Sequence, residues 1–199
     1  MYLQSLLVIF CLFICSYSQD TAETNQLPED DPKNFPEQNA KTLVELSGKH
    51  WVKKRTYSIT TPQGEPTCEY AEILGKTTTG DGYTLKLGAK LGSRWTSNTQ
   101  TLFLKTSEPH PAPNVLEFTR LKDDGPLGHP LLYSDYKECH IVRILKKNSP
   151  VYRCDMLLTK EAAKIDPPAD CETKFKQYCP GAAVEVYMSS CDKTGPKTA

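Results

Sequence analysis

Two cysteines, a histidine and an aspartate lie in one short stretch, YSDYKECHIVRILKKNSPVYRCDMLLTKE, which covers residues 133–161. Cys139, His140, Cys154 and Asp155 could form disulfides, ligate a metal, belong to a catalytic set or line a cavity. Each half of the stretch alternates apolar and polar residues, and a Lys-Lys-Asn-Ser-Pro turn joins the halves. This pattern is typical of a β-hairpin. Successive side chains of a strand point to opposite faces, so each cysteine and its polar neighbour face opposite sides.

The wider sequence favours neither catalysis nor metal binding. A His/Asp pair without a nucleophile beside it does not fill the roles of a catalytic set. The chain contains no G-x-S-x-G, H-E-x-x-H, phosphate-loop or dinucleotide motif. It also lacks the C-x-x-C pairs or clustered histidines that would support zinc, the competing interpretation of the cysteines. We therefore expect no enzymatic activity, no cofactor and no metal.

The N-terminus predicts secretion. An apolar run at residues 6–15 is followed by the small residues Ser16 and Ser18. Such a run suits a signal peptide and is too short to span a bilayer. We expect cleavage after residue 18, a secreted protein and no membrane partner. Six of the eight cysteines then remain, an even set that indicates disulfides, although sequence arithmetic does not select their pairing.

Charge and composition limit the partners and the domain organisation. The 24 basic and 24 acidic residues balance, so there is no basic field for nucleic acid, and we expect no nucleic-acid partner. Residues 19–35 are polar and acidic, which predicts a flexible arm. Residues 36–191 suit a single domain, and residues 192–199 suggest a flexible tail.

The hairpin is one part of a longer β pattern. From His50 onward, apolar residues recur with a period of two, in roughly eight short segments separated by turns. We expect an all-β fold, an eight-stranded antiparallel up-and-down barrel, which can hold one small ligand. A helix is predicted within 36–48, and another within 167–179 packs on the outside. A solid β-sandwich built for protein contacts is the alternative.

Four segments carry a resemblance to a known family: YSDYKECHIVRI, YRCDMLL, PPADCETKFKQYC and VEVYMSSC. In this order they resemble the histamine-binding-like lipocalins of tick saliva, and the resemblance covers most of the chain after the signal peptide. It implies a lipocalin barrel, secreted in saliva, that sequesters a small host mediator and suppresses inflammation or haemostasis. It also implies three disulfides that clamp the C-terminal segment to the barrel: Cys68–Cys191, Cys139–Cys171 and Cys154–Cys179.

That pairing orients the hairpin. If both hairpin cysteines face out, His140, Asp155 and Leu157 face in, and a turn centred on Lys147-Asn148 places His140 across from Asp155. A buried His140–Asp155 pair is the plain interpretation, and direct contact with a ligand is the alternative. Strand aromatics are further candidates for the ligand-binding lining: Tyr57, Tyr70, Trp95, Phe103, Phe118 and Tyr133. Trp51 is expected to pack at the closed end.

The resemblance also bears on the ligand. Amine-binding members carry Cys-Asp-aliphatic followed by Glu-Leu-aromatic, whose carboxylates pair with an ammonium. This chain has Cys-His-Ile at 139–141 and Asp-Met-Leu at 155–157. The change favours a lipid, such as a leukotriene, fatty acid or sterol, slightly over histamine or serotonin. The second hypothesis is an effector that binds a host immune or complement protein through its loops or outer surface. A monomer is expected in either case.

Overall fold

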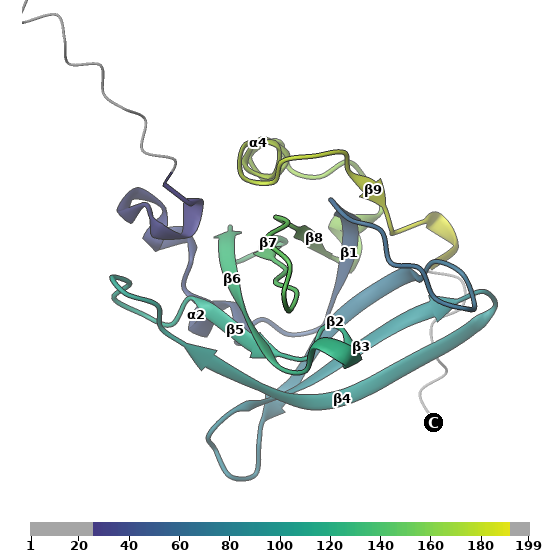
Figure 1. The fold of residues 1–199 in the computed structure, drawn as a ribbon, viewed down its shortest axis with the longest axis horizontal. Coiled ribbons are helices and arrows are strands. Elements are labelled where there is room, and N and C mark those ends of the chain that lie inside the picture. The colour runs from purple at the N-terminus through teal and green to yellow at the C-terminus, as the bar shows by residue number, and fades with distance from the viewer. Residues whose placement is uncertain (1–25, 192–199) are drawn as a thin grey trace, which may run out of the picture.

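The segments that alternate apolar and polar residues form a nine-stranded antiparallel sheet in the order β2-β3-β4-β5-β6-β7-β8-β1-β9. A further pairing of β1 with β2 closes β1–β8 into a barrel, as predicted, and this closure is inconsistent with an open sandwich (Figure 1). The structure is a computed structural model and describes residues 26–191. The predicted signal peptide and C-terminal tail therefore lie outside the described residues. The strands are β1 (Lys49–Arg55), β2 (Thr67–Lys76), β3 (Tyr83–Leu91), β4 (Arg94–Lys105), β5 (Val115–Phe118), β6 (Leu127–Ser134), β7 (Cys139–Arg143), β8 (Cys154–Thr159) and β9 (Val184–Glu185).

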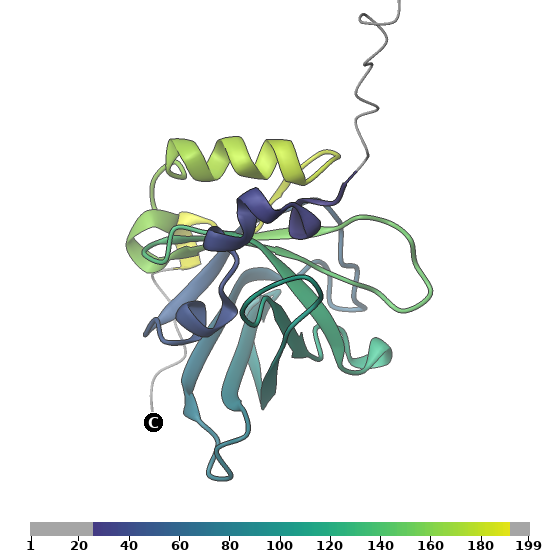
Figure 2. The same cartoon turned by 90° about the vertical axis from the view of Figure 1, so that its left-hand side faces the viewer.

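Short helices surround this barrel. Within the described residues no helix is long and apolar enough to cross a membrane. Figure 2 shows α4 lying across the outside of the barrel, with the N-terminal helices beside it. The helices are η1 (Pro28–Asp30), η2 (Pro32–Glu37), α2 (Ala40–Val44), η3 (Lys122–Asp124), α3 (Lys160–Ala163), α4 (Ala169–Tyr178) and η4 (Ser189–Cys191).

The hydrophobic core has two parts, because the two faces of the barrel wall are both covered. One cluster fills part of the interior and includes Leu85, Leu102 and Leu131. The other lies between the outer face of β7 and β8 and the helix α4, and it includes Met156 and Phe175. Covering the outer face explains why β8 has no exposed position.

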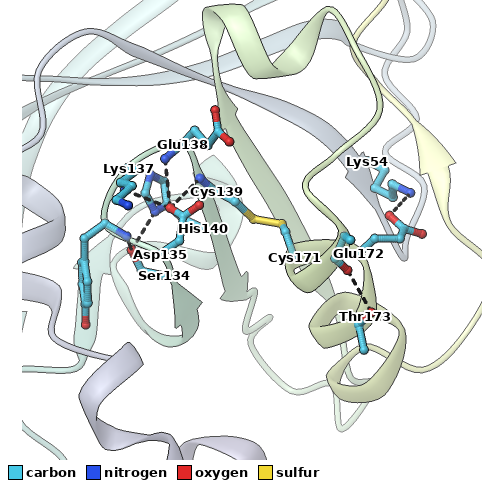
Figure 3. The surroundings of a disulfide bond; sticks show 12 residues. Lys54, Ser134, Asp135, Lys137, Glu138, Cys139, His140, Cys171, Glu172 and Thr173 are labelled. Carbon is cyan, nitrogen blue, oxygen red and sulfur yellow. Dashed lines mark hydrogen bonds and ion pairs between the residues drawn. A yellow bond between two sulfur atoms is a disulfide. The ribbon is translucent and has the colours of Figure 1, made fainter.

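Three disulfides hold the C-terminal segment against the wall. Cys139 on β7 is joined to Cys171 on α4, which Figure 3 shows together with an ion pair of 2.7 Å between Lys54 Nζ and Glu172 Oε2. The other two link β8 to the end of α4 and β2 to η4. The resulting pairs are those implied by the family resemblance: Cys68–Cys191, Cys139–Cys171 and Cys154–Cys179.

The N-terminal segment differs from the predicted flexible arm wherever the structure describes it. Residues 28–37 form η1 and η2, and the Glu29 side chain is buried against Arg143 of β7. The Glu29 carbonyl oxygen lies 2.5 Å from His110 Nε2. Pro28 and Pro32 occupy the first turns of these helices, and the buried carboxylate of Glu29 neutralises the half-buried Arg143.

The helix predicted within 36–48 is present but shorter. Its start is set by Asn39, whose side-chain oxygen accepts hydrogen bonds from the backbone N–H groups of Lys41 and Thr42. This is the usual role of an N-cap residue. The α-helix therefore begins at Ala40, after the 3₁₀ turn that contains Pro36.

Candidate ligand-binding cavity

The barrel encloses a cavity of about 370 Å³. This volume falls in the lower part of the range of small-molecule pockets, about 300–1,000 Å³. Ionisable side chains enter the cavity at two places, and Thr96, Ser97 and Asn98 of β4 add uncharged polar groups to its wall. Most of the remaining wall is apolar and includes Val52, Ile73, Leu85, Leu102, Leu116 and Phe118.

The first polar place is a charged cluster of four residues, Arg55, Glu69, Arg120 and Asp155, of which all but Arg55 line the cavity. Glu69 Oε2 lies 3.0 Å from Arg55 Nη1 and 2.6 Å from Arg120 Nη2. Arg120 Nε lies 3.3 Å from Asp155 Oδ2. Two guanidinium groups therefore face two carboxylates, and the charged cluster carries no net charge when all four residues are ionised.

Burial governs the protonation of this cluster. Burial raises the pKa of Asp155 above its ordinary value, and the adjacent Arg120 offsets only part of that effect. The pKa of Tyr57 is also raised, by burial and then by the negative charge of Asp155, so its phenol stays neutral. Asp155 Oδ1 and Tyr57 Oη are buried, and neither has a hydrogen-bond partner of acceptable geometry among residues 26–191.

The second polar place is a histidine pair, His50 on β1 and His140 on β7. Their ring centroids are 4.8 Å apart and the rings meet edge to face. His140 Nδ1 lies 2.9 Å from Ser134 Oγ, a contact visible in Figure 3. Burial, followed by the proximity of His50, lowers the pKa of His140 to about 3, while Asp135 acts in the opposite direction. Burial also lowers the pKa of His50. Both rings are therefore neutral at physiological pH.

The hairpin side chains face the sides that the alternation predicted, but the two strands do not pair in the predicted register. His140, Asp155 and Leu157 all line the cavity. However, His140 is opposite Leu157, and Asp155 is opposite Val142, so the predicted His140–Asp155 pair was wrong. The turn pairs Lys146 with Ser149, as the prediction required. In β7 and β8, however, each residue is opposite a partner two positions further along β8 than that turn predicts. Pro150 follows the turn and has no N–H group, so the ladder cannot continue from the turn into β8.

Among the aromatic candidates, Tyr70 and Phe118 lie in the cavity wall and the others do not. Phe103 follows the wall residue Leu102 on β4 and so faces away from the cavity, near Lys105. A register shift between Leu131 and Tyr133 turns Tyr133 to the outer face, under Lys174 of α4.

The remaining aromatics do not line the cavity: Trp51 and Trp95 belong to the second cluster of the core, and Tyr57 packs against the first. Trp95 lies 6.3 Å from the Trp51 ring and 6.4 Å from the Tyr70 ring, measured between centroids. Trp51 also contacts Tyr187 of the C-terminal segment and has a packing role. Tyr57 contacts the charged cluster through the guanidinium of Arg55, 5.5 Å from its ring centroid.

Sequence reasoning missed His50, Arg55, Glu69 and Arg120. A signal for Glu69 was present, because each strand cysteine is followed by a polar residue that faces the cavity. Glu69 follows Cys68 just as His140 and Asp155 follow their own cysteines. Arg120 lies in a loop beyond the end of β5, where strand alternation gives no information about its direction.

Known proteins give two kinds of match, a family model and solved structures. The family model described as "Tick histamine binding protein" matches residues 28–193. No curated protein matches the chain. Among solved structures, the serotonin complex of AM182 has a TM-score of 0.56 and 21% identity, over 76% of this chain and 91% of that one. Insecticyanin from the tobacco hornworm Manduca sexta has a TM-score of 0.54 and 14% identity, over 77% of this chain and 84% of that one. Japanin from Rhipicephalus appendiculatus bound to cholesterol has a TM-score of 0.49 and 16% identity, over 71% of this chain and 93% of that one.

Proposed function

Because the chain belongs to the tick histamine-binding protein family and has its lipocalin fold, we propose that it sequesters a small amphipathic ligand with no net positive charge. The protein is secreted in saliva, and it acts by binding a host mediator stoichiometrically. The observation that carries this proposal is an apolar cavity whose buried charges already neutralise one another.

An ammonium ligand would gain little from this cavity. Entering the barrel costs a cation its hydration, and an uncompensated carboxylate is the group that best repays that cost. Glu69 is already paired with two guanidinium groups, and Asp155 with one. The residue that stands where amine-binding members carry an aspartate is His140, which is neutral. AM182 was solved with serotonin, but this chain is only 21% identical to it.

Native mass spectrometry of protein secreted from eukaryotic cells, followed by calorimetry on delipidated protein, tests the proposal. We expect cholesterol or a long-chain alcohol to bind at one site per chain, at least tenfold more tightly than histamine or serotonin. No binding by any apolar probe would refute the proposal and favour the protein-binding hypothesis. Tighter binding of an amine, weakened at least tenfold by Asp155→Asn, would refute the ligand class.

A matched pair of variants shows whether binding occurs inside the barrel. Ile73 on β2 lines the cavity, and its neighbour Leu74 is 54% exposed. Ile73→Trp fills the cavity and should weaken binding more than tenfold. Leu74→Trp adds the same side chain outside and should leave the affinity unchanged. Equal effects of the two variants would place the ligand elsewhere.

A further inference from the structure

We propose that the histidine pair binds the polar group of the cavity ligand, and that this group is a neutral hydroxyl. The inference rests on the proposed function, because it specifies the chemistry of a ligand that the cavity holds. It assigns a role to two buried residues that the charged cluster leaves unused.

The two imidazoles are built into the wall with a free nitrogen each. His50 is 7% exposed and His140 is 2% exposed, and both line the cavity. The Nε2 atoms of both rings are buried and lack hydrogen-bond partners within the described part of the chain. Buried polar atoms in folded proteins are nearly always hydrogen-bonded. Partners for these two atoms can therefore come from the contents of the cavity.

The hydrogen-bond network assigns a donor role to His140. The backbone N–H of Tyr136 donates to Ser134 Oγ over 3.0 Å. The serine proton then has His140 Nδ1 as its acceptor, 2.9 Å away, and the structured residues supply no other hydrogen-bond acceptor for it. A neutral imidazole that accepts at Nδ1 carries its proton on Nε2. His140 therefore presents an N–H donor to the cavity.

His50 supplies the complementary role. Its ring meets that of His140 edge to face, with 4.8 Å between centroids, and both rings line the same cavity. The proposal requires the neutral His50 tautomer that carries its proton on Nδ1, because that ring accepts at Nε2. A hydroxyl fits this pair because it accepts one hydrogen bond and donates another. An ammonium group cannot accept from His140, and a carboxylate cannot donate to His50. The neutral rings give neither ion a counter-charge.

The histidine pair is separate from the charged cluster. His140 and Val142 are two residues apart on β7, and Val142 is the residue opposite Asp155. Two residues of strand span about 7 Å, so a single hydroxyl cannot contact both polar places. A ligand held by the histidine pair places its apolar body against the aliphatic wall.

Two isomeric probes test the inference: 1-decanol, and methyl nonyl ether, which lacks a hydroxyl donor. Calorimetry on the delipidated protein should show about tenfold tighter binding of the alcohol, because the ether leaves the His50 acceptor unpaired. His50→Phe and His140→Phe should reduce this preference to less than threefold. His129→Phe is the matched control, because His129 is buried beside Phe118 but does not line the cavity, and the preference should persist.

The outcomes separate this inference from the proposed function. Equal binding of the two isomers by the wild-type protein overturns the hydroxyl assignment and leaves lipid sequestration standing. Binding of neither isomer, nor of cholesterol, overturns the proposed function itself. If the phenylalanine variants fail to fold, ¹⁵N spectroscopy of the wild-type imidazoles decides. The alcohol should shift the Nε2 resonances of both histidines, and unchanged resonances would refute their contact with it.

Discussion

Acidification should destabilise this protein through its buried histidines. Burial, then the positive charge of Arg120, lowers the pKa of His129 to about 4, and burial lowers that of His140 to about 3. Both have an ordinary pKa of 6.5. The unfolded chain therefore binds protons as the pH falls below 6.5, while the folded protein does not until the pH reaches about 4 for His129 and about 3 for His140. Stability is fully present above pH 6.5 and is lost progressively between that value and the folded pKa.

The expected loss is large for a single domain. Each pH unit below 6.5 costs about 1.4 kcal/mol per histidine, so a change from pH 7 to pH 5 costs about 2 kcal/mol for each residue. His129 and His140 together should lower the free energy of unfolding by about 4 kcal/mol. Domains of this kind are stable by only about 5–15 kcal/mol in total. His50, whose pKa is also lowered, adds to the effect.

Urea unfolding at pH 7, 6 and 5, followed by the fluorescence of Trp51 and Trp95, measures this loss. Other groups titrate too, including Asp155, whose raised pKa acts in the opposite direction. The comparison of wild type with His140→Phe removes those shared contributions. The variant should lose about 2 kcal/mol less than wild type between pH 7 and pH 5. Identical pH dependence in the two proteins would show that His140 is not held neutral by burial.

Three further predictions concern the framework of the cavity. Arg120→Met removes a partner of two buried carboxylates and should lower the free energy of unfolding, measured in urea, by about 3–5 kcal/mol. Lys105→Met removes a partner from an exposed ion pair and should lower it by less than about 1 kcal/mol. Similar losses in the two variants would contradict the burial assigned to Arg120. Replacing both Cys68 and Cys191 by alanine removes a disulfide between residues 123 positions apart and should lower the free energy of unfolding by about 5 kcal/mol. Glu29→Gln should speed amide hydrogen exchange across η1 and η2, and unaltered exchange would mean that the Arg143 contact does not hold this segment.

The sequence predicted the barrel and the inward faces well because both depend on local alternation. Once Cys139 and Cys154 were placed outside, the period of two placed His140 and Asp155 inside. The same reasoning failed wherever the ladder is irregular. A proline after the hairpin turn moved the register by two residues, and an irregularity in β6 turned Tyr133 outward.

The rest of the site depends on residues that only tertiary structure brings together. Glu69 and Arg120 are 51 positions apart in sequence, and their contact requires the closed barrel. Arg120 belongs to a loop, so no periodicity predicted that it would fold back over the cavity. The acidic N-terminal segment was predicted to be flexible for a similar reason. The partner of Glu29, Arg143, lies 114 residues further along the chain, so its charge is neutralised only after folding.

The disulfide between Cys68 and Cys191 encloses most of the chain in one covalent ring. Every loop between these residues, including the turns at 77–82 and 144–153, lies inside that ring. A protease that cuts any single loop there opens the ring but releases no fragment, because both pieces stay joined through sulfur. Cuts between Cys139 and Cys171 or between Cys154 and Cys179 are bridged a second time. A molecule cut once within the ring therefore keeps all eight strands of its barrel attached, and a protease must cut at least twice to remove any strand that lies within the ring.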